Sequence, residues 1–455
     1  MSRTEIGSGI LSGGPVNPDD VTSPTTRLGV VTVLGLLTVF TPQLGIGLPS
    51  SLLLLGIAIV VAAIVWSEQQ LSPYFDRDLG VFALLLGLIA LGIIRESVAV
   101  NIEGLVISIG VLIGCLLLWT GLAHRFSSEF LVWIGTILVG SIGGIVLHEG
   151  YTAIVPEPFG LEMKLLIFAS ISGAMIASIT MHQVGKFSIS THFIAVGIFV
   201  FVFVGLGVDT TWIWILITAL GMMAFGLLAY AIGVGSIQGT GAGVFFGFVT
   251  LVFGGIAWFT ILFTFVVGGA LVTKYRYRQK ARRGVAEADH GTRGIANVFG
   301  NGSIAFIAVI GYRAATEFFP GISNIFMVIF AAAMATALAD TISSEIGVLY
   351  DNPRLITTLN TVPVGTNGGV TWQGAVTGTF GSLCVAILAV IAFHQIDVQI
   401  GAILLLAGIV GMMADSILGA TLEGDAIGNQ GVNLLATLVG SIFAVGAGLG
   451  FGLFG

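Results

Sequence analysis

The chain has 455 residues, of which 56% are hydrophobic and only 9% are charged, and its net charge is −7. Soluble domains carry about a quarter charged residues, so this composition excludes an ordinary soluble protein, and we expect no nucleic-acid partner. Apolar runs long enough to cross a bilayer as helices recur from Leu28 to Gly455, whereas closed barrels show short alternating segments. The sequence therefore predicts an all-α, polytopic integral membrane protein of the cell membrane.

Residues 1–27 are polar and rich in Gly, Ser, Thr and Pro. They lack the basic region, short apolar core and cleavage site of a signal peptide, so we interpret them as an N-terminal tail. Roughly 14 transmembrane helices follow by the hydropathy rule. The predicted spans are 28–45, 48–66, 79–94, 98–120, 130–147, 163–181, 193–208, 212–232, 243–272, 304–318, 322–338, 370–393, 398–420 and 432–454.

The segment 243–272 is too long for one upright span and is interrupted at Gly254 and Gly255. It can be one tilted helix, one broken helix, or two helices.

The loop at residues 274–294 contains seven of the chain's sixteen Lys and Arg residues. The positive-inside rule places such a loop in the cytoplasm, and we interpret most of its cations as topology anchors or contacts to anionic lipid. Counting spans onward from it brings residues 340–369 and the turn after the span 398–420 to the same face. Parity therefore gathers three polar segments on the cytoplasmic side.

Two carboxylates stand where the span 322–338 reaches that face. Asp340 and Ser344 share a helical face, and Glu345 lies just around it. One or two carboxylates with water and phosphate oxygens are the ligands that Mg²⁺ prefers, so we predict a Mg²⁺ site here. A solvated helix end is the alternative interpretation.

A glycine-rich turn, Gly365, Thr366, Asn367, Gly368 and Gly369, precedes the span 370–393. Consecutive amides at a helix N-terminus suit a phosphate group, although no Lys follows as in a Walker A loop. A simple loop with Thr366 or Asn367 as the N-cap would look similar.

Other polar residues of the same face are candidates for binding phosphate or supporting the site. Arg354 and Thr358 lie in the loop before the glycine turn, and Arg293, Asn297 and Asn301 follow the basic loop. Asp415 and Asn433 fall inside apolar runs, where an unpaired polar group is costly, so we expect them to face the bundle interior. The turn between the last two spans adds Glu423, Asp425 and Asn429.

The motifs ADTISSEIGVL, PRLITTLNTVPVGTNGGVTWQG, ADSILGATLE and NQGVNLLATL, with the linker RRGVAEADHGTRGIANVFGNG, resemble the membrane family that contains plant phytyl-phosphate kinase. The resemblance covers roughly residues 221–455. We therefore divide the chain into the tail 1–27, a hydrophobic helical region 28–220 to which no role is assigned, and a phytyl-phosphate-kinase-like membrane domain 221–455.

The resemblance implies phosphoryl transfer from a nucleoside triphosphate, with CTP as the expected donor, to a long-chain isoprenyl monophosphate such as phytyl or geranylgeranyl phosphate. In that interpretation, Asp340, Glu345, Asp415 and Asp425 hold Mg²⁺ or its waters. Residues 365–369, Arg354 and Arg293 bind phosphate, and Asn429 and Asn433 support the site. Glu423 stands where many relatives carry Gln, and a longer insertion after it is absent, which leaves the substrate open.

Two other functions fit the same residues. A transporter would use Asp340, Asp415 and Asn433 to bind an ion or polar substrate among discontinuous helices, although no internal repeat is evident. A lipid-phosphate cytidylyltransferase would share the nucleotide and the metal but release pyrophosphate. No oligomeric state is predicted.

Overall fold

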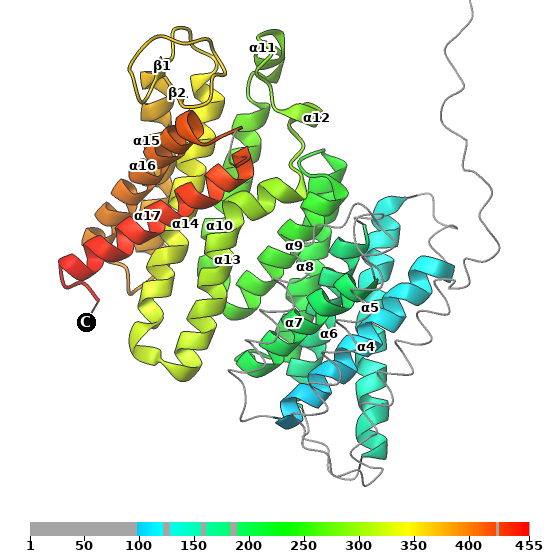
Figure 1. Ribbon diagram of the computed structural model, residues 1–455. Helices are drawn as coiled ribbons and strands as arrows, with labels where there is room; N and C mark the ends of the chain where they lie inside the picture. The colour runs from blue at the N-terminus through cyan, green and yellow to red at the C-terminus, as the bar shows by residue number, and fades with distance from the viewer. Residues whose placement is uncertain (1–97, 122–127, 156–160, 183–188, 425–426, 455) are drawn as a thin grey trace, which may run out of the picture. The chain divides into compact units, whose positions relative to one another are not determined.

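The computed structural model describes residues 98–121, 128–155, 161–182, 189–424 and 427–454, all of which belong to one compact unit, Ile64–Gly455. The spans expected at 28–45, 48–66 and 79–94 lie outside the described residues. The helices (Figure 1) are α4 Val98–Gly121, α5 Glu129–Ile154, α6 Met163–Met181, α7 Ile189–Leu206, α8 Trp212–Ala231, α9 Ile237–Phe253, α10 Ile256–Lys274, α11 Tyr277–Arg282, α12 Ala288–Gly291, α13 Ile295–Phe318, the 3₁₀ turn η3 Pro320–Ile322, α14 Ser323–Gly347, α15 Trp372–Ala392, α16 Val398–Thr421 and α17 Asn429–Gly450; two short strands, β1 Arg354–Leu355 and β2 Gly369–Val370, pair antiparallel.

Nine helices within these described ranges are long and apolar enough to cross a membrane, and three shorter apolar helices accompany them. The predicted helical membrane fold is confirmed. The long segment 243–272 proves to be two helices, α9 and α10, separated at Gly254 and Gly255. Gly255 has φ +80°, a left-handed conformation that glycine adopts at little cost, and this conformation lets the chain turn between the two helices.

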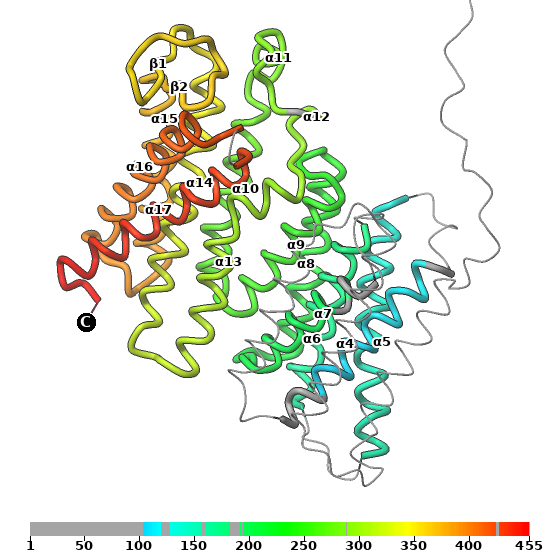
Figure 2. Tube along the Cα trace, in the orientation of Figure 1, coloured from blue at the N-terminus to red at the C-terminus, as the bar shows by residue number. Residues whose placement is uncertain are grey.

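In the first half, α4 packs closely against α5, and α6 and α7 pack beside them. Glycines allow the close approach, since a Cβ on Gly110 of α4 would collide with the backbone of Gly143 on α5. A cluster of phenylalanine rings then joins α6 and α7 to α9 through Phe168, Phe203 and Phe245. The tube in Figure 2 follows this passage from the early helices into the later ones.

In the second half, α14 is the central helix and packs against α10, α13, α15, α16 and α17. Its segment 331–339 consists of small or slender residues, AAAMATALA, and all of them are buried. Glycines of the neighbouring helices approach it closely, because a Cβ on Gly411 or Gly440 would collide with Thr336. Small residues permit such packing within membranes. The carboxylate of Asp340 follows directly after this tightly packed stretch.

The three polar segments that parity predicted to meet do lie at one end of the bundle (Figure 1). Arg283 of the basic loop pairs with Asp351 at 3.1 Å between Nη1 and Oδ1, and it donates a hydrogen bond to the Val348 carbonyl. Gly368 lies against the end of α16, at Ser416 and Ala420. The location of this end in the cytoplasm stays a prediction from the charge distribution.

Candidate functional site

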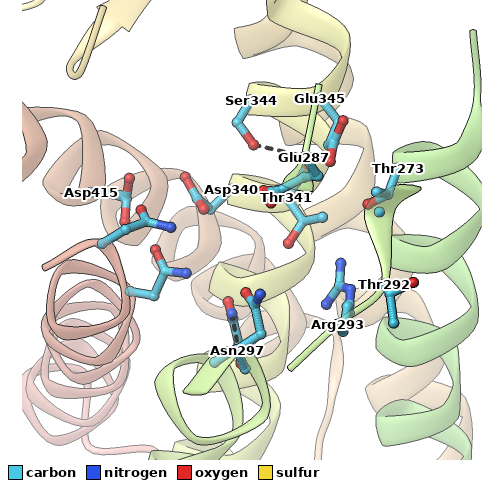
Figure 3. Close-up of a pocket in the computed structure, with 14 residues that line it drawn as sticks. Thr273, Glu287, Thr292, Arg293, Asn297, Asp340, Thr341, Ser344, Glu345 and Asp415 are labelled. Carbon is cyan, nitrogen blue, oxygen red and sulfur yellow. Dashed lines mark hydrogen bonds between the residues drawn. The ribbon is translucent and has the colours of Figure 1, made fainter. Parts of the chain in front are cut away.

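A polar cavity of about 150 Å³ lies where α10, α13, α14, α16 and α17 converge beneath the basic loop (Figure 3). Most of its lining side chains carry oxygen or nitrogen. The lining residues are Thr273, Glu287, Gly291, Thr292, Arg293, Asn297, Asn301, Asp340, Thr341, Ser344, Glu345, Asp415, Asn429 and Asn433.

A pair of carboxylates occupies one side of the cavity. Asp340 of α14 and Asp415 of α16 approach closely enough for their side chains to share a hydrogen bond. Two adjacent buried carboxylates repel each other when both are ionised, so the pair either shares one proton or binds a cation. Glu423, just after α16, adds negative charge near both aspartates, and burial raises the pKa of Glu423 above its ordinary value. This side of the cavity therefore favours a cation.

An asparagine network orients Asp415. With its amide nitrogen turned toward the neighbouring acceptors, Asn433 donates to Asp415 Oδ1 at 3.1 Å and accepts from Asn301 Nδ2 at 3.1 Å. Asn301 also donates to the Asn297 carbonyl one helical turn earlier, at 3.1 Å. Asn301 and Asn433 are both buried, so these hydrogen bonds satisfy groups that would otherwise be costly within the membrane. The network joins α13 and α17 to the carboxylate pair.

Glu345 has a different partner from the one we expected. Its Oε2 lies 2.5 Å from Lys280 Nζ, and Lys280 is completely buried. Lys280 also donates to the carbonyls of Val272 and Thr273 at the C-terminal end of α10, where a cation is favoured. Among the described residues, no group of three or more His, Cys, Asp and Glu side chains could hold a metal ion. The expected set of Asp340, Glu345 and Asp415 is thus reduced to the aspartate pair, with Glu345 bound to Lys280.

Arg293 lies across the cavity from the aspartates and points into it (Figure 3). Its backbone is held by the turn before α9, because its N–H donates to the Val234 carbonyl and its carbonyl accepts from the Ser236 N–H. Its guanidinium stacks on Phe265, 5.4 Å from the ring centroid, and forms no hydrogen bond or ion pair with any residue that the structure describes. Burial lowers the pKa of Arg293, and the nearby carboxylates of Glu345 and Glu287 oppose that shift. The N–H donors of this guanidinium therefore have no acceptor within the described part of the chain.

The structure does not bring the whole predicted site together. Asp340, Ser344, Glu345, Asp415, Asn429, Asn433, Arg293 and Asn301 line the cavity, and Asp425 lies outside the described residues. Arg354, Thr358 and residues 365–369 belong to the loop around β1 and β2 and do not line it. Arg354 is exposed, and its Nη1 donates to the Leu359 carbonyl of its own loop at 3.1 Å.

The glycine turn is not the start of a helix. The N-cap of α15 is Thr371, whose side chain accepts from the Gly374 N–H, so neither Thr366 nor Asn367 has that role. The N–H groups of Thr366 and Gly369 already donate to carbonyls within the turn, those of Pro363 and Thr366. Gly365 and Gly368 have φ of +86° and +72°, so their glycine identity serves the turn itself.

Sequence reasoning missed several residues of the cavity. Thr273, Glu287, Thr292 and Thr341 line it, and Lys280 neutralises Glu345. Lys280 stands among six other cations of the same loop, and nothing in its local sequence distinguishes it. The one available signal was the pairing rule for buried charges, by which a carboxylate at membrane depth requires a cation close by.

The family model for "Integral membrane protein DUF92" matches residues 220–441. An uncharacterized membrane protein of Methanocaldococcus jannaschii is 33% identical over 44% of this chain and 79% of its own length. One from Synechocystis is 33% identical over 41% of this chain and 71% of its own. The chloroplastic protein VTE6 of Arabidopsis thaliana is 31% identical over 46% of this chain and 64% of its own.

No solved structure matches the chain. The family match begins at residue 220, within α8, close to residue 221, where the sequence resemblance is expected to begin. The chain therefore belongs to the integral membrane protein family DUF92, the family that its C-terminal motifs resemble.

Proposed function

We propose that this protein is a membrane-embedded phosphotransferase that converts a long-chain isoprenyl monophosphate to the diphosphate. An oxygen of the acceptor phosphate forms a bond to the γ-phosphorus of a nucleoside triphosphate while the bond from that phosphorus to the β-phosphate oxygen breaks. With CTP, the donor that the family resemblance implies, the products are the isoprenyl diphosphate and CDP. Kinship to the chloroplastic protein VTE6 at 31% identity supports the proposal.

The observation that carries the proposal is the unpartnered Arg293 facing a carboxylate pair across a small polar cavity. Phosphoryl transfer requires positioning and charge neutralisation more than covalent help from the protein. A guanidinium binds phosphate oxygens with two parallel hydrogen bonds, and no described residue accepts a hydrogen bond from that of Arg293. The cavity thus offers a cation for phosphate on one side and anions for a metal on the other.

The residues present fit a Mg²⁺ ion. One or two carboxylates with water and phosphate oxygens satisfy this ion, and Asp340 and Asp415 are such a pair. Mg²⁺ bound there would neutralise negative charge on the phosphate groups. Asn433 holds Asp415 in place, and Lys280 keeps the charge of Glu345 balanced beside the pair. The proposal does not require Arg354, Thr358 or the glycine turn.

The test is the reaction itself in lipid nanodiscs, with radiolabelled CTP, Mg²⁺ and a panel of isoprenyl monophosphates. We expect diphosphate formation that falls at least about 100-fold in Arg293→Gln. In the matched control Arg354→Gln, which changes an exposed arginine bonded only to its own loop, the rate should stay within about threefold of wild type. Folded protein that makes no diphosphate from any acceptor would refute the kinase proposal. Release of pyrophosphate in place of CDP would identify a cytidylyltransferase.

A further inference from the structure

A second cavity adjoins the polar one. It has a volume of about 90 Å³ and lies among α8, α9, α10 and α13. Its lining is almost entirely apolar and includes Phe225, Phe246, Leu262 and Phe265. Among the described residues, Arg293 and Asn297 line both cavities. The two cavities are therefore neighbours, one polar and one apolar, with Arg293 and Asn297 on their common border.

The apolar cavity is bounded by helices that face lipid. Leu220, Leu227 and Leu228 of α8 and Leu271 of α10 are exposed apolar residues in spans, so their surfaces contact the bilayer. Phe225 of α8 meets Phe263 of α10 with ring centroids 5.7 Å apart. Two of the helices that bound the apolar cavity, α8 and α10, therefore also have lipid-facing surfaces.

We infer that the apolar cavity seats the first isoprene unit of the acceptor, next to its phosphate, and that the rest of the chain lies in the bilayer. The identity of the acceptor rests on the function proposed above. The location rests on the shared Arg293, which can hold the phosphate in one cavity while its stacking partner, Phe265, contacts the chain in the other. An engineered apolar cavity of about 150 Å³ holds one benzene ring, so at the same density the cavity of about 90 Å³ admits about four carbons, which is most of one branched isoprene unit and not a long chain.

This size has a consequence for specificity. In this arrangement the apolar cavity contacts the branched carbons nearest the phosphate and is too small to enclose the units beyond them. Selection therefore acts on the shape of the first unit, because one methylene more or less in an apolar pocket changes the rate about 10- to 200-fold. The total length of the isoprenyl chain affects turnover mainly by changing how strongly the substrate partitions into the membrane.

Gly243 of α9 offers a direct test. It lines the apolar cavity, and a Cβ placed on it meets no protein atom within 4 Å. A larger side chain can therefore be introduced at this position without a clash at its Cβ, and we expect the leucine of Gly243→Leu to occupy space in the cavity assigned to the isoprene unit. Gly221 of α8 is the matched control, since its Cβ also meets nothing within 4 Å, it is exposed, and it does not line the cavity.

The experiment measures binding and turnover of farnesyl and geranylgeranyl monophosphate by the full-length protein in nanodiscs. For Gly243→Leu we expect at least a tenfold loss of affinity, of the same size for both chains, while Gly221→Leu stays within about threefold of wild type. Gly243→Ala, with a single added methyl group, should show a smaller loss and serves if the leucine variant does not fold. Unchanged affinity in both Gly243 variants, or a loss that grows with chain length, would overturn the inference.

The two proposals can fail separately. If binding depends on Gly243 and Arg293 but no diphosphate forms, the isoprene site in the apolar cavity is supported and the phosphotransferase proposal is refuted. If diphosphate forms at the same rate in the Gly243 variants as in wild type, the phosphotransferase proposal is supported and the isoprene site in the apolar cavity is refuted.

Discussion

The buried ion pair between Lys280 and Glu345 should couple the stability of the basic loop to that of α14. Lys280 has no exposed surface and Glu345 has 7%, and their charged atoms lie 2.5 Å apart. Replacing Lys280 by Met leaves the Glu345 carboxylate buried without its cation, and removing one partner of a buried pair costs about 3–5 kcal/mol. The double variant Lys280→Met/Glu345→Gln removes both charges, so most of that loss should be recovered.

The recovery should be incomplete, because the carbonyls of Val272 and Thr273 also lose their donor in the Lys280 variant. Unfolding of wild type, both single variants and the double variant in the same detergent completes a double-mutant cycle. Additive losses, with the double variant less stable than either single one, would refute the pairing. Activity of the double variant separates two roles of Glu345: pairing alone predicts that transfer recovers with stability, whereas a metal ligand predicts a folded, inactive protein.

Three further predictions concern the polar cavity. Asp340→Asn and Asp415→Asn should each lower the transfer rate about 100-fold or more without lowering the unfolding temperature, because each removes half of a like-charge pair; a fully active variant of either would contradict the metal assignment. Asn433→Leu should cost about 1–3 kcal/mol in detergent unfolding, since it leaves Asp415 and Asn301 without their shared partner, and an equally stable variant would argue against the network. Burial, aided by the charge of Glu345, raises the pKa of Glu287 above its ordinary 4.5. The folded state therefore holds that proton more tightly, so its contribution to stability is present at low pH and is lost as the pH rises from about 4.5 through the raised pKa. Relative to Glu287→Gln, the wild type should lose unfolding temperature across that window and remain level above it, and an unchanged difference would contradict the shift.

Much of the fold could be predicted from composition. Residues 163–181 form a helix with the predicted ends, and the other expected spans within the described ranges begin or end within a few residues of real helices. Two of these helices, α13 and α14, extend nine residues beyond the predicted span at their other end. Helix α13 begins at Ile295, nine residues before the predicted span. The hydropathy rule missed these first turns because they carry the polar residues Asn297 and Asn301. Helix α14 continues to Gly347 for the same reason, since its polar end faces a cavity lined by protein and not lipid.

The candidate site could be predicted only in part. Asp340, Asp415 and Asn433 were identifiable because a polar group inside an apolar run is costly unless it faces the bundle interior. The sequence could not indicate whether Arg293 or Arg354 is the better candidate for binding phosphate, because both are arginines in polar loops. The structure separates them, with Arg293 directed into the cavity and Arg354 exposed on its own loop.

The sequence by itself determined that this protein is helical and crosses the membrane, because the cost of placing backbone and charge in hydrocarbon is a property of each segment alone. The sequence also determined which loops lie on the same side of the membrane, because each transmembrane span takes the chain from one side to the other. The tertiary structure decided which charges are paired. Lys280 contacts Glu345 across 65 residues of sequence, and such partners depend on how α10 packs against α14. The same packing placed an apolar cavity beside a polar one and set Arg293 between them.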